Sequence, residues 1–127
     1  MEVAYQDFRF NRYKEVVMTI YITQGRYSQQ AMKGLVAKPE DRQAEVRKLI
    51  EGSGGKLLSY YITFGKYDFI AITEAKSEED ILTALAVVGA GGGVSENCTV
   101  TAMTTAAAKR AFERANKLAG SFKSAGT

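Results

Sequence analysis

The sequence comprises 127 residues, a length that fits one domain built around a single hydrophobic core. Hydrophobic residues account for 46% of the chain and charged residues for 24%, which is typical of globular proteins and excludes the compositions of disordered and membrane-spanning chains. The formal net charge of +3 is too small to indicate nucleic-acid binding by electrostatics.

The residue types restrict the chemistry further. Histidine is absent, so a Ser-His-Asp triad and a histidine-bound haem or zinc are excluded. Cys98 is the single cysteine and cannot form a disulfide within the chain. The charged residues between Glu2 and Glu15 interrupt any signal-peptide core, and the apolar runs are too short to span a bilayer. We therefore expect a cytoplasmic protein that uses no metal or cofactor and does not enter a membrane.

The first half of the chain is predicted to form a strand and two helices. Apolar and polar residues alternate over 16–23, which indicates a strand that Gly25 ends. Ser28 is suited to cap a short helix that reaches Val36, and Pro39 separates this helix from a second helical stretch. Glycines at 52–55 then end the second helix.

A tight hairpin is predicted in the middle of the chain. Two strands over 57–64 and 68–75 flank a turn at 65–67, where Gly65 supplies the conformational freedom of a short antiparallel connection. Because helical patterns lie on both sides of the hairpin, it fixes the architecture.

The remaining chain is predicted to form a helix, a strand and a final helix. Ser77, followed by acidic residues, begins the helix, and the glycine run 89–93 ends it. A strand follows over 95–105, and 106–119 has the pattern of an amphipathic helix. The expected buried face of the helix that begins at Ser77 comprises Ile81, Leu82, Leu85 and Val88.

This order of elements predicts an α+β, ferredoxin-like βαββαβ fold with an antiparallel sheet and both main helices on one face. To the helix-covered face we assign Met18, Ile20, Ile22, Leu58, Tyr60, Ile62, Ile70, Ile72, Cys98, Val100 and Ala102. To the opposite face we assign Thr19, Tyr21, Leu57, Ser59, Tyr61, Phe69, Ala71, Asn97, Thr99, Thr101 and Met103. Cys98 is thereby expected to be an inert core thiol.

The second of these faces is almost free of charge, although a sheet face in water normally carries Lys and Glu. We therefore expect a second copy of the chain to cover it, in a homodimer or a higher oligomer. Two such sheets packed face to face form a barrel-like dimer, and a small organic ligand is expected in the gap between them.

Several sequence elements match a known family. They are Tyr21-Ile22-Thr23-Gln24-Gly25 with Tyr27, then Arg42, Gly54-Gly55-Lys56, Gly65-Lys66-Tyr67-Asp68-Phe69 and Glu74-Ala75. In this order, from about Met18 to Met103, the sequence resembles the GYD domain family. The resemblance implies a dimeric α/β-barrel, related in fold to cofactor-free monooxygenases, muconolactone-type isomerases and the ligand-sensing domain of Lrp/AsnC regulators, and it implies no particular activity. It divides the chain into an extension over 1–17, a GYD-like domain over 18–105 and a C-terminal helix and tail over 106–127.

Aromatic and hydroxyl residues supply the ligand-binding candidates. Tyr21 and Tyr61 either orient a polar group of a ligand or fill the dimer core with their hydroxyls bonded to threonine. Tyr27 and Tyr67 each follow a Thr-x-Gly-x element, and we place them at opposite rims of the sheet. The full set of ligand-binding candidates is Thr19, Tyr21, Tyr27, Tyr61, Tyr67, Phe69 and Thr101.

Asp68 is the one candidate catalytic residue. It either acts as a general base beside Tyr67 or accepts backbone N–H bonds at the turn, and the second role is the more common for aspartate at such a position. The N-terminal arm, residues 1–17, carries aromatic residues among arginines and is expected to pack on its own domain or on a neighbouring subunit.

Three functional hypotheses follow. The first is a non-enzymatic homo-oligomeric module that binds a small ligand or supports assembly. The second is a small cofactor-free oxygenase or isomerase in which Tyr21 or Tyr61 orients the substrate and Asp68 is the base. The third is a regulatory protein whose basic C-terminal helix binds another protein or nucleic acid, although the charge pattern is more typical of a solvated helix face.

Overall fold

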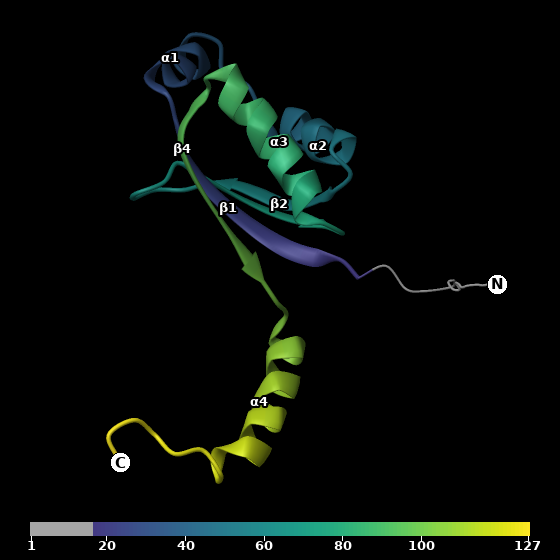
Figure 1. Cartoon of the computed structure of the whole chain (residues 1–127). Coiled ribbons are helices and arrows are strands. Elements are labelled where there is room, and N and C mark those ends of the chain that lie inside the picture. The colour runs from purple at the N-terminus through teal and green to yellow at the C-terminus, as the bar shows by residue number, and fades with distance from the viewer. Residues whose placement is uncertain (1–16) are drawn as a thin grey trace, which may run out of the picture.

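The computed structural model describes residues 17–127. Its elements, in chain order, are β1 (Thr19–Tyr27), α1 (Gln29–Ala37), α2 (Gln43–Gly52), β2 (Lys56–Ile62), β3 (Phe69–Ala75), α3 (Glu78–Gly91), β4 (Val94–Ala102) and α4 (Thr105–Ala119). Figure 1 shows α1, α2 and α3 on one side of the sheet, whereas α4 projects from the end of β4 on the other side. The docking predicted for the N-terminal arm falls outside the described residues.

One sheet holds the four strands in the order β2-β3-β1-β4, and every neighbouring pair is antiparallel. With α1 and α2 between β1 and β2, and α3 between β3 and β4, this is the predicted ferredoxin-like arrangement. The central strand β1 pairs on both sides, so that Tyr21 lies opposite Thr73 of β3 and Thr101 of β4. The pairing of β2 with β3 is interrupted by a bulge between Leu57 and Ser59.

The predicted hairpin is present between β2 and β3. Gly65 adopts a φ of 101°, which only glycine reaches without strain. The backbone N–H of Thr63 donates to the carbonyl oxygen of Asp68 at 2.9 Å, and the Thr63 hydroxyl donates to the carbonyl oxygen of Tyr67 at 2.9 Å. The turn therefore spans 63–68 and is longer than the sequence predicted.

Strand β1 continues past Gly25, where the sequence predicted its end. Gly25 pairs with Phe69 of β3 and Asn97 of β4. A Cβ at this position would lie 2.8 Å from Phe69 Cε2, so the absent side chain makes room for the ring. Glycine here serves close packing inside a strand and not a turn.

Serine side chains cap α1 and α3 at the positions that the sequence indicates. The Ser28 hydroxyl accepts the backbone N–H of Ala31 at 3.1 Å, and the Ser77 hydroxyl accepts that of Asp80 at 3.3 Å. Helix α3 ends at the left-handed residue Gly92, with a φ of 74°. No helix within residues 17–127 combines the length and the apolar character needed to cross a membrane.

The two faces of the sheet are largely inverted relative to the prediction. Tyr21, assigned by sequence to the uncovered face, is only 4% exposed and packs with Ala75 of β3 and Ile81 of α3 in the core. Phe69 and Ala71 are also buried on the helix-covered side. The isoleucines of β1 and β3 point the other way, because side chains alternate along a strand.

The cause of the wrong assignment is that neither face of the sheet is marked by charged side chains over its centre. When both faces carry uncharged residues, the alternation of side chains separates them into two sets but does not say which set the helices cover. The structure places Ala71, Thr73 and Ala75 beneath the helices together with the larger Tyr21 and Phe69, and most of the aliphatic residues of β1 and β3 remain on the other side.

Strand β2 follows a different pattern because of its bulge. Leu57 pairs with Thr73 and is buried on the helix side, contrary to the prediction. Beyond the bulge, Tyr60 pairs with Ala71 on the helix side and Tyr61 pairs with Ile70 on the uncovered side, as predicted for both tyrosines.

We call the side of the sheet away from α1, α2 and α3 the open face. Its central side chains, read from the strand register, are Ile20, Ile22, Gln24, Ser59, Tyr61, Ile70, Ile72, Cys98, Val100 and Ala102. Cys98 is exposed there, so the prediction of a core thiol was wrong. Within α3, Ile81 is buried and Leu85 packs against the core as predicted, but Leu82 is 65% exposed.

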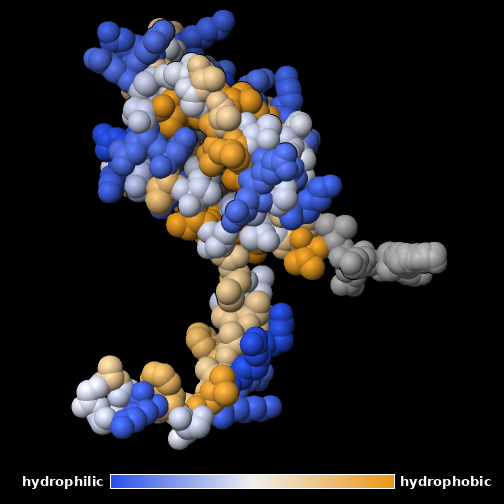
Figure 2. Space-filling view, viewed as in Figure 1, coloured by the Kyte–Doolittle hydropathy of each residue, from blue (hydrophilic) through white to orange (hydrophobic). Residues whose placement is uncertain are grey.

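Helix α4 begins at its cap Thr104, whose hydroxyl accepts the backbone N–H of Ala107 at 3.1 Å. No residue of α4 is buried by the part of the chain that the structure describes. Figure 2 shows hydrophilic side chains along one side of this helix and apolar ones along the other. The predicted amphipathic helix is therefore present, with its apolar side uncovered by the described residues.

Candidate functional site

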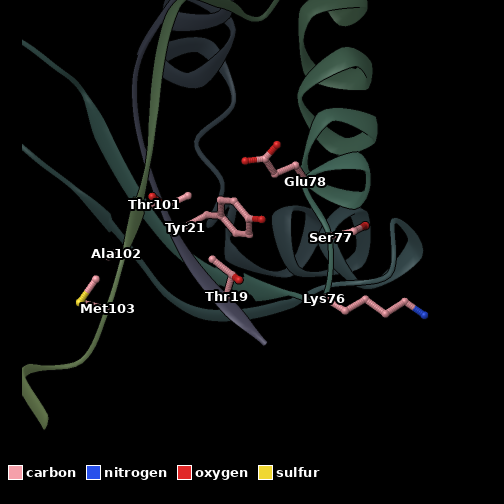
Figure 3. A pocket seen from close by; sticks show the side chains of 8 residues that line it. All are labelled: Thr19, Tyr21, Lys76, Ser77, Glu78, Thr101, Ala102 and Met103. Carbon is pink, nitrogen blue, oxygen red and sulfur yellow. The ribbon is translucent and has the colours of Figure 1, made fainter. Parts of the chain in front are cut away.

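A hollow of about 580 Å³ opens beneath the N-terminal end of α3, between this helix and the ends of β1 and β4. Figure 3 shows the Tyr21 ring at its centre, with Thr19 and Thr101 beside it and Glu78 across from it. The residues that line it are Thr19, Tyr21, Lys76, Ser77, Glu78, Thr101, Ala102 and Met103.

The fold brings these residues together from three segments. Thr19 and Tyr21 project from β1 to the helix side, and Thr101 is placed beside Tyr21 by the β1–β4 register. Ser77 and Glu78 enter because α3 begins directly after β3, at the edge of the hollow. The site is therefore built at the junction of β3 and α3.

A second hollow of about 200 Å³ continues along the side of α3. It shares Tyr21, Glu78 and Thr101 with the first, so we treat the two as one groove, called the α3 groove. The further residues that line it are Ile81, Leu82, Leu85, Thr99 and Val100. The α3 groove thus has one end rich in hydroxyl groups and another end that is mainly aliphatic.

An aromatic cluster lies elsewhere on the helix side of the sheet, where β1 ends and β3 begins. The hydroxyl oxygens of Tyr27 and Tyr60 are 2.6 Å apart, and both rings pack on Phe69 with centroid distances of 5.3 Å and 5.8 Å. Burial, together with the hydrogen bond to Tyr27, raises the pKa of Tyr60 far above its usual value. Tyr60 therefore stays protonated and acts as a structural hydrogen-bonding group.

The segment Gly65-Lys66-Tyr67-Asp68 ties the hairpin to β1. One carboxylate oxygen of Asp68 accepts the backbone N–H of Tyr27 at 2.9 Å, and the backbone N–H of Asp68 donates to the Gly25 carbonyl oxygen at 2.7 Å. The Arg26 guanidinium donates to the Lys66 carbonyl oxygen at 2.9 Å. The carboxylate of Asp68 thus accepts a backbone N–H, the common role considered for it, although the donor lies in β1 and not in the turn.

The profile of the GYD domain matches residues 21–112 of this chain. The chain belongs to the GYD domain family. The match begins within β1, covers the other three strands and α1 to α3, and ends within α4. The resemblance read from the sequence ended earlier, at about Met103. Comparison with curated proteins returned no match.

The GYD domain brings only some of the predicted ligand residues together. Thr19, Tyr21 and Thr101 meet in the α3 groove. Their shared face follows from the strand register, but this face points toward α3, so these residues do not line a gap between two sheets. Tyr61 is on the open face and 63% exposed.

The remaining ligand-binding candidates lie in or next to the segment Gly65-Lys66-Tyr67-Asp68. Tyr27 and Phe69 belong to the aromatic cluster, and Tyr67 lies beneath the Lys66 ammonium, with 5.5 Å between Nζ and the ring centroid. The predicted placement of Tyr27 and Tyr67 at opposite rims was wrong. Because β1 and β3 are antiparallel, the end of β1 adjoins the start of β3, and both segments share one rim.

Sequence reasoning predicted only Thr19, Tyr21 and Thr101 among the residues of the α3 groove, and it missed the polar segment Lys76, Ser77 and Glu78 and the aliphatic residues of α3. Ser77 was recognised only as a helix cap. When a helix begins directly after a strand, its cap residue lies at an end of the sheet. Side chains from neighbouring strands meet at such an end, so the Ser77 cap could have pointed to this site. Within residues 17–127, no cluster of cysteine and acidic residues is arranged to hold a metal ion.

The raised pKa of Tyr60 predicts how the stability of the GYD domain depends on pH. In the unfolded chain a tyrosine ionises near pH 10, whereas folded Tyr60 remains protonated. The unfolded state therefore binds fewer protons above pH 10, and the free energy of unfolding should fall as the pH rises beyond that value. Urea denaturation at pH 8 and pH 11 should show a larger loss for the wild type than for Tyr60→Phe, and equal losses would contradict the prediction.

Proposed function

We propose that this GYD domain protein is a homodimeric module in which two sheets pack through their open faces and each subunit holds a small organic molecule in its α3 groove. The observation that carries the proposal is the apolar centre of the open face. Ile22 and Ile72 are opposite each other on the two central strands, and Ile20 and Ile70 lie on the same face, opposite Glu74 and Gln24; no described residue covers them with a second layer.

The edge strands extend this apolar surface. Val100 of β4 is 52% exposed and pairs with Ile22, and Tyr61 of β2 pairs with Ile70. Single exposed apolar residues are common on proteins, but contiguous patches of this kind mark interaction sites. The apolar surface of the open face extends over several strands, so we expect a partner to cover it.

Charged residues occur on the open face only toward the strand ends. Glu74 pairs with Lys56 at one end of the sheet, and Arg26 pairs with Glu96 at the other. An apolar centre bounded by charges of both signs is the usual anatomy of a protein interface, and it offers no net positive surface to a nucleic acid. A second copy fits because a two-fold interface requires only that one patch complement itself.

The α3 groove supports the ligand-binding part of the proposal. Its volumes of about 580 Å³ and 200 Å³ suit a small organic molecule. Hydroxyl groups at one end and aliphatic side chains at the other favour a molecule with an apolar body and a hydrogen-bonding group. Binding is the role we assign to the groove, and the Ser77 hydroxyl at its edge serves as the cap of α3 by accepting the backbone N–H of Asp80.

Replacing Ile22 with lysine should separate the dimer. The ammonium group would be placed at the centre of the interface, where it would lose its water without gaining a partner. Native mass spectrometry should report a dimer for the wild type and a monomer for Ile22→Lys. Val36→Lys is the matched control, because Val36 is 75% exposed on α1, and it should remain a dimer. A monomeric wild type would overturn the dimer.

The same measurement tests the ligand. Protein purified under non-denaturing conditions should carry an additional small mass, and Thr101→Trp should lose that mass while remaining a dimer, because the indole fills the groove where both hollows meet. A dimer whose bound mass persists in Thr101→Trp would show that the molecule binds elsewhere.

A further inference from the structure

Helix α4 stands apart from the domain that precedes it. It leaves the end of β4 on the open-face side of the sheet, opposite α1, α2 and α3 (Figure 1). Phe112 is 71% exposed and Leu118 is 68% exposed, although both are large apolar residues. A helix of 15 residues with this pattern gains little stability alone and is normally held by packing of its apolar side.

The two sides of α4 differ sharply. Along one side lie the apolar residues Ala108, Ala111, Phe112, Ala115, Leu118 and Ala119. Along the other lie charged residues, among them Lys109 and Glu113, whose side chains form an ion pair at 2.8 Å. Figure 2 shows this division, with the apolar side toward the left of the view. The charged side is exposed, as charged side chains normally are, whereas the large apolar residues of the other side are also exposed and lack a packing partner among the described residues.

We propose that α4 of each copy packs, through Phe112 and Leu118, along the second copy of the chain in the dimer. This inference rests on the proposed function, because the second copy is the molecule that covers the open face. A partner on the open face lies on the same side of the sheet as α4 and therefore meets the helix. The family match ends within α4, so the helix continues directly from the domain.

The area that a stable dimer must bury also supports the second copy of the chain as the partner of α4. The four strands, of 9, 7, 7 and 9 residues, give the open face a footprint of roughly 500 Å². A stable interface of standard size buries about 800 Å² on each partner. A helix of this length and width covers roughly 225 Å². In a two-fold dimer each copy contributes its own α4 and the surface beneath the partner's α4, which together bring the footprint to about 950 Å².

The test compares two double variants of the full chain. Phe112→Gln with Leu118→Gln removes the apolar contacts of α4, and Arg110→Gln with Arg114→Gln introduces the same residue on the charged side. Sedimentation across a dilution series should show a dimer dissociation constant raised at least about tenfold by the first variant and changed little by the second. Far-ultraviolet circular dichroism should confirm that both variants fold.

Equal dissociation constants for the two double variants, in a protein that Ile22→Lys still separates, would overturn the role of α4 and leave the dimer intact. A monomeric wild type would overturn both. Cross-linking of dimers mixed from isotopically heavy and light chains supplies a second measurement. Lys109 and Lys117 should yield heavy–light cross-links, and cross-links confined to one chain would show that α4 packs on its own copy.

Discussion

Gly25→Ala is expected to reduce the free energy of unfolding by about 1–3 kcal/mol, because the new methyl group has no space. A Cβ at Gly25 would lie 2.8 Å from Phe69 Cε2 and 2.7 Å from Asn97 Oδ1. The Phe69 ring cannot withdraw easily, since it packs on Tyr27 and Tyr60. Urea denaturation followed by circular dichroism measures the loss in the free energy of unfolding. A loss of this size is substantial, because the total free energy of unfolding of a domain is typically about 5–15 kcal/mol.

Gly34→Ala is the matched control for this substitution. Gly34 lies in α1, and a Cβ there would contact nothing within 4 Å. Alanine favours the helical state over glycine by about 0.5–1 kcal/mol, so this variant should be slightly more stable than the wild type. Equal effects of the two substitutions would show that the close packing at Gly25 does not limit stability.

Asp68→Ala is expected to cost about 1.5–3 kcal/mol of stability, because the backbone N–H of Tyr27 loses its charged acceptor in a partly buried position. The substitution also weakens the connection between the hairpin and β1, which the Asp68 backbone supports through Gly25. Thermal and urea denaturation of the purified variant measure the loss.

Asp68→Asn separates this structural role from a catalytic one. The asparagine oxygen can still accept the Tyr27 N–H, so stability should recover in large part, whereas a general base would be lost. Lys66→Ala, two residues before Asp68, serves as a control for changes in the turn, because only the Lys66 backbone carbonyl, which the substitution keeps, accepts the Arg26 guanidinium. If Asp68→Ala were as stable as the wild type, the bond to Tyr27 would not hold the hairpin in place.

Local sequence signals predicted the fold well because they act over a few residues. Gly65 at the turn, and Ser28 and Ser77 as caps, each satisfy a backbone requirement that does not depend on the rest of the chain. The element order then leaves few ways to connect four strands and two main helices, and the ferredoxin-like topology is one of them.

The faces of the sheet were not predicted because they depend on packing between elements. Alternation placed Thr19, Tyr21 and Thr101 on one face correctly, but hydrophobicity alone could not decide which face the helices cover. Packing decides it: Ala75 and the larger Tyr21 lie together beneath Ile81 of α3. Glu78 joins the candidate site only through the placement of α3 over the strand ends, which the sequence pattern does not encode locally.

The edges of the sheet also bear on how the protein assembles. On one edge strand, β2, the pairing is broken by the bulge between Leu57 and Ser59, and the pairing of β1 with the other edge strand, β4, shifts between Arg26 and Tyr27. Such irregularities add local twist and disturb the row of free backbone groups that an added strand would need. The addition of a further strand, and with it strand-by-strand growth into fibrils, is thereby discouraged at both edges of the sheet.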